Sequence, residues 1–227
     1  MLTQTFWNWR NAFDFALRRL LGWSIRSSAF LPSSVEFRQG LEVFEFLEKF
    51  PWKEGAGPLT VVDVGCRTFF LAEPIDRLFR EMGYTPYVHG VEVDAYRRLA
   101  DFRTRLQHGQ ANAASIAHGT FHPTDFLKWE TPADVILLLH PFVKERAVLA
   151  WGLPLRFLKP EALFQRCADT LKPGGVLLVS GPTEEELEMS CALAMQFGFS
   201  VLERASWLPT SGSAQKTARY GVLFEKH

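Results

Sequence analysis

The sequence lacks an excess of charge of either sign. Its 227 residues carry 25 Lys and Arg against 25 Asp and Glu, so the formal net charge is zero at pH 7. A general nucleic-acid-binding protein usually shows a clear basic excess. The charge balance therefore gives no strong nucleic-acid signal, although it leaves room for a local basic patch.

Cysteine is scarce, and the three that occur are Cys66, Cys167 and Cys191. They are odd in number, widely spaced and form no Cys-x-x-Cys pair, which favours reduced thiols over a disulfide framework. This pattern predicts a cytoplasmic protein.

Long apolar runs are also missing. The longest strong one, at 135–139, is far shorter than the roughly 18 residues that a membrane-spanning helix needs. The N-terminus has no cationic region followed by an uninterrupted apolar one, so we expect no signal peptide. The hydrophobic fraction, 47%, is ample for a core, and the chain length suits one large domain or one domain with an appendage.

One stretch, Leu59-Thr-Val-Val-Asp-Val-Gly-Cys-Arg-Thr68, organises the rest of the chain. A short apolar run ended by a glycine is typical of a strand buried on both faces, followed by a tight turn and a helix. In open α/β sheets, ligands bind beyond the carboxyl ends of the strands. Residues 63–70 are therefore predicted to form the mouth of a ligand crevice.

Strand and helix patterns alternate after this point. Strands are predicted at 59–64, 87–93, 116–121, 134–140, 176–180, 200–204 and 219–225, and helices at 73–82, 95–107, 161–171 and 183–197. Such alternation implies right-handed crossovers and a largely parallel sheet with helices on both faces.

Residues 1–58 are predicted to be a helical extension or lid, separate from an α/β domain at 59–227. A first, aromatic-rich helix within 1–30 suits core packing, a membrane-surface or partner-binding helix, or a lid over a substrate. A second helix, at 33–50, begins with the capping box Ser33–Glu36 and ends at Pro51.

Five short motifs, in this order, resemble those of the class I S-adenosylmethionine-dependent methyltransferases: Val61-Val-Asp-Val-Gly65, Gly90-Val-Glu92, Thr124-Asp-Phe126, Asp134-Val-Ile-Leu-Leu138 and Leu171-Lys-Pro-Gly-Gly175. The resemblance covers about residues 59–226. It implies a Rossmann-like fold with a seven-stranded, mostly parallel sheet whose last strand is antiparallel. It also implies S-adenosylmethionine as the cofactor, S-adenosylhomocysteine as its product, and no metal.

The candidate cofactor-binding residues lie at the predicted strand ends: Asp63, Gly65, Cys66, Arg67, Glu92, Asp125 and Phe126. A carboxylate at Glu92 can accept hydrogen bonds from both hydroxyls of a ribose, and the resemblance implies the same role. It also implies that Asp125 accepts from the adenine amine while Phe126 covers the ring. Asp63 could orient the loop or accept from a ligand ammonium.

Structural roles are equally possible at these positions. Asp63 could cap a loop, Glu92 could be solvated, and Asp125 could cap a short helix. The Cys66 side chain is expected to fill a small apolar space and not to act as a nucleophile, because no base is identifiable beside it.

The loop after the first strand departs from the family pattern Asp-x-Gly-x-Gly-x-Gly, because Arg67 and Phe69 replace the second and third glycines. Either residue is strained if its φ must be positive. In one interpretation the loop takes a different path and Arg67 pairs with a carboxylate, such as that of the cofactor. In the other, Arg67 and the Phe69–Phe70 pair fill the pocket, and the chain is an inactive binding or scaffold protein.

His140 is the candidate catalytic residue. The sequence His140-Pro141-Phe142 half resembles the Asn/Asp-Pro-Pro-aromatic motif of amino-directed methyltransferases. A histidine there could take the acceptor's proton, or it could simply hydrogen-bond a backbone carbonyl. His118 and His122 are four residues apart, but Gly119 and Pro123 disfavour the helix that would make them metal ligands.

The acceptor is predicted to be a small molecule, small or apolar, because aromatic and aliphatic residues dominate 1–58 and 142–160. A nicotinamide-dependent oxidoreductase is a weaker alternative, since the Gly-x-Gly-x-x-Gly fingerprint is absent. Oligomeric state has no signature in the sequence.

Overall fold

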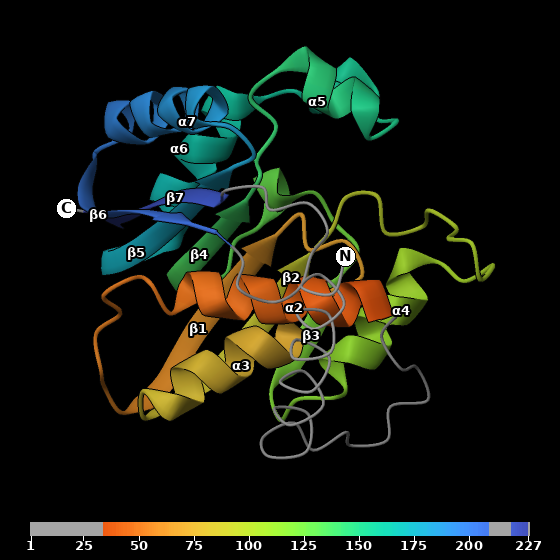
Figure 1. Ribbon diagram of the computed structural model, residues 1–227, viewed down its shortest axis with the longest axis horizontal. Helices are drawn as coiled ribbons and strands as arrows, with labels where there is room; N and C mark the ends of the chain where they lie inside the picture. Colours follow the sequence, from red (N-terminus) through yellow and green to blue (C-terminus); the bar gives the residue numbers. More distant parts are fainter. Residues whose placement is uncertain (1–33, 209–218, 227) are drawn as a thin grey trace, which may run out of the picture.

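The computed structural model describes residues 34–208 and 219–226. These residues form a three-layer α/β fold with a twisted sheet in the middle (Figure 1). The strands are β1 Gly57–Val64, β2 Tyr84–Val91, β3 Gly119–His122, β4 Ala133–Leu139, β5 Leu171–Gly181, β6 Phe199–Trp207 and β7 Arg219–Lys226. Their order in the sheet is β3-β2-β1-β4-β5-β7-β6.

The pairing confirms the predicted fold class. β1 to β5 pair in parallel, whereas β7 lies antiparallel to both β5 and β6. β1 and β4 lie at the centre, and Val61, Val62 and Ile136 are completely buried there. Each such side chain contributes roughly 1.5–3 kcal/mol of hydrophobic stabilisation.

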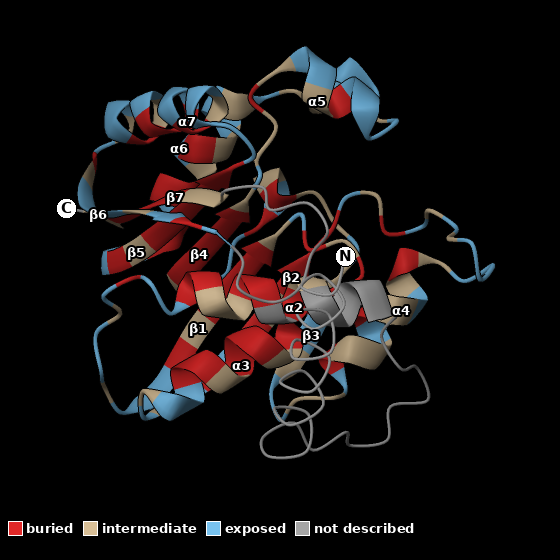
Figure 2. Cartoon of the chain, viewed as in Figure 1, coloured by how far each residue is buried: buried red, intermediate tan, exposed pale blue. Residues whose placement is uncertain are grey.

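Helices cover both faces of the sheet. They are α2 Ser34–Leu47, α3 Ala72–Glu81, α4 Arg105–Ala113, α5 Glu145–Ala150, α6 Pro160–Thr170 and α7 Glu184–Gln196, with 3-10 turns η1 Phe126–Lys128 and η2 Leu155–Phe157. α2 and α3 pack on one face, and α6 and α7 on the other (Figure 1). Burial follows these layers, while α5 stands away from the sheet with a largely exposed surface (Figure 2).

The predicted helix at 95–107 is wrong. Residues 94–104 form turns with one isolated bridge between Arg98 and Thr104, and the helix begins only at Arg105. The reason is a capping box: Thr104 Oγ1 accepts from the Gln107 amide at 3.2 Å, and Gln107 Oε1 accepts from the Thr104 amide at 2.8 Å. This pair fixes the helix start ten residues later than predicted.

α2 belongs to the core of the described fold. Val43, Phe46 and Leu47 are buried in the same cluster as the β1 side chains. Glu42 pairs with Arg219 at 3.1 Å, which ties α2 to β7. The predicted second helix is thus confirmed over 34–47. The predicted aromatic helix and Ser33 lie outside the described residues, and the boundary at residue 58 stays a prediction.

Two further findings concern membrane-spanning helices and thiols. No helix in 34–208 or 219–226 is long and apolar enough to cross a membrane. The three cysteines are free thiols and all are buried.

Candidate functional site

A cavity of about 560 Å³ opens at the carboxyl ends of β1, β2 and β4. Eight of its lining residues are those predicted from the sequence: Asp63, Gly65, Cys66, Arg67, Glu92, Asp125, Phe126 and His140. The fold therefore brings together residues that are up to 77 positions apart. Their roles in binding and catalysis stay predictions.

Asp63 ends β1 with its carboxyl group almost fully enclosed. The residue is 1% exposed, and its Oδ2 has no hydrogen-bond partner among the described residues. Burial, with a smaller effect from the charge of Glu92, raises the pKa of Asp63 to about 7. An unsatisfied buried acceptor of this kind is costly in the free protein and is available to a ligand that donates a hydrogen bond.

Glu92 joins the loops that follow β1 and β2. Its Oε2 accepts from the Arg67 amide at 2.8 Å, and its Oε1 accepts from the Asp94 amide at 2.7 Å. The residue is only 4% exposed, so the alternative of a solvated Glu92 is wrong. A carboxylate offers about four acceptor sites, which leaves capacity for ligand hydroxyl groups.

Arg105 completes this arrangement, and the sequence reasoning missed it. Its Nη1 lies 3.5 Å from Glu92 Oε1 and 3.2 Å from Asp94 Oδ2, and the residue is 6% exposed. Two acids at the end of a buried strand are a signal that a cation is needed nearby. Several arginines follow in 97–105, so the sequence could not indicate which one.

The loop after β1 keeps the conformation that glycine would favour. Gly65, Arg67 and Phe69 have φ values of +72°, +57° and +56°. A left-handed residue other than glycine costs roughly 1–2 kcal/mol. The bond from the Arg67 amide to Glu92, and one from the Phe69 amide to the Cys66 carbonyl at 2.7 Å, hold the strained residues in place.

Phe69 does not fill the cavity. Its side chain is completely buried beside Phe121, and it occupies the space above Gly90, where an added Cβ would lie 2.6 Å from the ring. The blocked-pocket hypothesis is therefore wrong for Phe69, which belongs to the core and not to the cavity lining.

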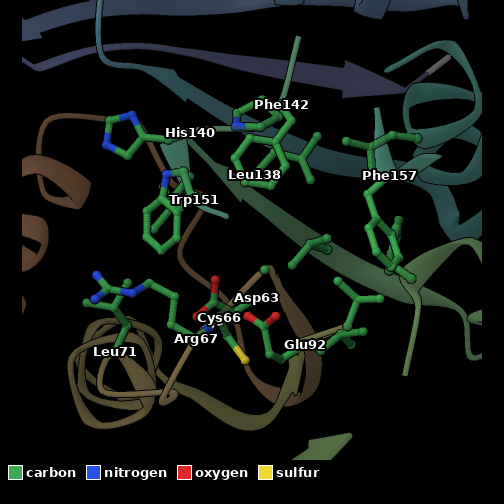
Figure 3. A pocket seen from close by; sticks show the side chains of 18 of the residues that line it. Asp63, Cys66, Arg67, Leu71, Glu92, Leu138, His140, Phe142, Trp151 and Phe157 are labelled. Carbon is green, nitrogen blue, oxygen red and sulfur yellow. Dashed lines mark hydrogen bonds between the residues drawn. The ribbon is translucent and has the colours of Figure 1, made fainter. Parts of the chain in front are cut away.

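The Arg67 side chain lies along the edge of the cavity. Its guanidinium is 5.1 Å from the Trp151 ring centre and 5.8 Å from that of Phe70. Figure 3 shows the side chain directed toward Trp151 and Leu71, away from the carboxylates of Asp63 and Glu92. It thus packs under Trp151 and leaves the acidic part of the cavity open.

Asp125 caps η1, as one of the two interpretations expected. Its Oδ1 accepts from the Leu127 amide at 3.0 Å. The carboxylate still lines the cavity and retains acceptor capacity. Phe126 follows at 4% exposure, with its side chain in the core beneath the cavity wall.

Cys66 behaves as the small apolar filler that was expected. It is 4% exposed, and burial raises the pKa of its thiol well above the usual value. A protonated, enclosed thiol is a poor nucleophile.

His140 follows β4 with a φ of +63°. Its amide donates to the Ser180 carbonyl at 3.0 Å, while none of the described residues makes a hydrogen bond to its ring. The ring keeps solvent access, but the protein atoms around it and the charge of Arg219 lower the pKa of His140 to about 4. The imidazole is therefore neutral near pH 7.

The histidines of β2 and β3 do not form a metal centre. His118 stacks on Tyr87 at 4.5 Å, whereas His122 Nε2 lies 3.2 Å from His89 Nδ1. Within the described ranges, no three His, Cys, Asp or Glu side chains converge to hold a metal ion.

The same architecture occurs in solved methyltransferase structures. A methyltransferase from Pyrococcus furiosus superposes with a TM-score of 0.60, is 18% identical, and the match covers 96% of both chains. The N-methyltransferase NodS from Bradyrhizobium japonicum WM9, solved with S-adenosyl-L-homocysteine, gives 0.52 and 13%, over 95% of this chain and 98% of NodS. Magnesium protoporphyrin IX methyltransferase from Synechocystis PCC 6803, solved with S-adenosylmethionine, gives 0.52 and 16%, over 100% of this chain and 96% of that one.

Sequence comparisons add no closer relative. No protein-family model matches the chain, and no curated protein matches it. The chain has the fold of class I S-adenosylmethionine-dependent methyltransferases.

Proposed function

We propose that the protein is an S-adenosylmethionine-dependent methyltransferase with a small or apolar acceptor. The observation that carries this proposal is the unpartnered, buried Asp63 Oδ2, which faces the same cavity as Glu92 and Asp125. The cavity volume, about 560 Å³, falls within the range of about 300–1,000 Å³ typical of small-molecule sites.

The three carboxylates would divide the cofactor between them. Asp63 accepts from its ammonium group, Glu92 from the ribose hydroxyls and Asp125 from the adenine amine. These groups supply hydrogen-bond donors where the cavity offers acceptors. The ammonium group of the cofactor would also favour the ionised form of Asp63, which burial alone disfavours.

When bound, S-adenosylmethionine supplies an activated methyl group, which the acceptor's nucleophilic atom takes in line while the sulfur keeps the bonding electron pair. The protein's task is to align the two molecules and to exclude water. The neutral His140 takes the proton that the acceptor releases. Phe142, Trp151 and Phe157 line the same cavity and provide its apolar walls (Figure 3).

A non-catalytic scaffold is the second candidate, because Arg67 stands where the family has glycine and still lines the cavity. Calorimetric titration with S-adenosylhomocysteine separates the two. We expect micromolar binding to the natural chain. Absence of heat at millimolar ligand would support the scaffold.

Arg67→Gly sharpens this test. The Arg67 side chain packs under Trp151, and the amide that bonds Glu92 remains in the variant. In the folding free energy, relief of the left-handed strain, roughly 1–2 kcal/mol, offsets lost cation–π contacts of about 0.5–1 kcal/mol each. Both effects act on the free and the ligand-bound protein alike. We therefore expect the Kd for S-adenosylhomocysteine to change by less than about threefold. A blocking arginine would instead give a gain of tenfold or more in affinity.

The charge state of His140 can be measured without an acceptor. Burial and Arg219 lower its pKa to about 4, so a proton NMR titration of the imidazole should give a midpoint well below 6. His140→Gln identifies the resonance. A midpoint near the ordinary 6.5 would contradict the lowered pKa of His140.

A further inference from the structure

The cavity has charges of opposite sign on two different walls. Its acids are Asp63, Glu92 and Asp125, at the ends of β1 and β2 and just before η1. Two of its cations, Arg156 and Lys159, come instead from the segment between α5 and α6. The acidic wall suits a cationic nucleoside, which leaves the part of the cavity lined by Arg156 and Lys159 for the second molecule.

Ion pairing within the fold does not account for Arg156 and Lys159. Both are exposed, and neither forms a salt bridge with any residue of the described ranges. Two other cations of the cavity form ion pairs: Arg105 pairs with Glu92, and Arg219 pairs with Glu42 at 3.1 Å. The uncompensated positive charge of this region thus includes Arg156 and Lys159.

Helix stability does not account for Lys159 either. The residue is the N-cap of α6, and its side chain makes no capping hydrogen bond. A cation at a helix N-terminus is disfavoured, because the helix dipole already places partial positive charge there. The same position strengthens the attraction of this wall for an anion.

Aromatic side chains line the cavity together with these cations. Phe142 and Trp151 meet edge to face, with ring centres 6.3 Å apart, and the Arg156 guanidinium lies 5.1 Å from the Phe157 ring centre. In Figure 3, Phe142 and Phe157 flank the cavity above the carboxylates of Asp63 and Glu92. A ligand here would meet flat apolar surfaces and positive charge together.

We propose that the methyl acceptor is a small aromatic anion, such as an arylcarboxylate that also carries a hydroxyl or amino group, whose oxygen or nitrogen takes the methyl as the carbon–sulfur bond breaks and whose proton then passes to His140. The charged group of the acceptor binds Arg156 and Lys159, and its ring packs against the aromatic side chains of the same cavity, Phe157 beside Arg156 among them. This inference rests on the proposed function, whose cofactor would occupy the acidic wall.

A matched ligand series tests the charge of the acceptor. The probes are 6-fluoro-2-naphthoate, its neutral carboxamide and the cationic (6-fluoro-2-naphthyl)methylammonium, whose binding is followed by fluorine NMR relaxation with S-adenosylhomocysteine present. We expect the naphthoate to bind at least about tenfold more tightly than the amide, as a charge-assisted contact provides. The ammonium compound should bind most weakly.

Substitutions test whether the preference for the anionic probe depends on Arg156 and Lys159. Arg156→Gln combined with Lys159→Gln should remove the tenfold difference and leave amide binding unchanged. Arg156→Lys combined with Lys159→Arg should keep it, as should Arg146→Gln, which removes an exposed cation of α5 outside the cavity. Surface substitutions of this kind change folding stability little.

The outcomes distinguish the two proposals. Equal binding of naphthoate and amide, or a preference that survives the double glutamine variant, would overturn the inference of an anionic acceptor. Failure of S-adenosylhomocysteine to bind would overturn the proposed function alone. In that case the same series, run without it, still decides whether the cationic wall selects an anion.

Discussion

Asp63→Asn is expected to weaken binding of S-adenosylhomocysteine at least about tenfold and to remove most of the loss of stability that the ligand-free protein shows as pH rises from about 4 to 7. The loss of affinity follows from replacing Asp63 Oδ2, a buried oxygen that has no hydrogen-bond partner among the described residues, by a neutral amide. Hydrogen bonds to a charged group are worth about 1.5–3 kcal/mol, which corresponds to a factor of ten or more.

The pH effect follows from the raised pKa of the same group. Its pKa is 3.8 ordinarily and about 7 in the folded protein. The unfolded chain therefore loses this proton first as pH rises, and the free energy of unfolding falls between about pH 4 and pH 7. Between pH 5 and pH 8 the loss is of order 2–3 kcal/mol, and it is absent in the asparagine variant.

Urea unfolding at these two pH values, for the natural chain and the variant, measures the difference. Other titrating groups are common to both proteins and cancel. Asp169→Asn, at an exposed position of α6, is the matched control and should leave the pH dependence unchanged. An identical pH dependence in the Asp63 variant would show that this carboxyl group is not held protonated.

Glu92→Ala is expected to abolish measurable binding of S-adenosylhomocysteine and to destabilise the fold by about 3 kcal/mol. The variant leaves the Arg67 and Asp94 amides without their acceptor and removes one of the two acids that neutralise the buried Arg105. Chemical denaturation and calorimetric titration measure the two effects separately.

A double substitution separates structure from binding. Combining Glu92→Gln with Arg105→Gln removes both buried charges, so we expect it to recover part of the stability lost in Glu92→Gln alone. It should not recover the affinity, because the carboxylate proposed to bind the ribose is still missing. Undiminished binding by Glu92→Ala would contradict the assigned role.

The sheet could be predicted from the sequence because its central strands are buried on both faces. Val61, Val62 and Ile136 belong to short apolar runs that suit only such strands. Strand ends then located Asp63, Glu92 and His140, since parallel strands bring their carboxyl ends to one edge.

Side-chain partners were less predictable. The apolar pattern places Arg105 inside a predicted helix, whereas the capping box of Thr104 and Gln107 starts the helix at this residue. The pairing of Arg105 with Glu92 is a long-range contact without a local signal in the sequence. The direction of Phe69 depended on the space above Gly90, a position 21 residues further along. Such contacts follow from the packed fold and not from sequence spacing.

A crystal structure of the protein with S-adenosylhomocysteine tests the central claim most directly. We expect the ribose hydroxyls within hydrogen-bond distance of Glu92, the amino group beside Asp63, and Arg67 still packed under Trp151. Crystals grown at millimolar ligand in which this cavity contains only solvent, or the guanidinium of Arg67 turned toward Asp63, would contradict it.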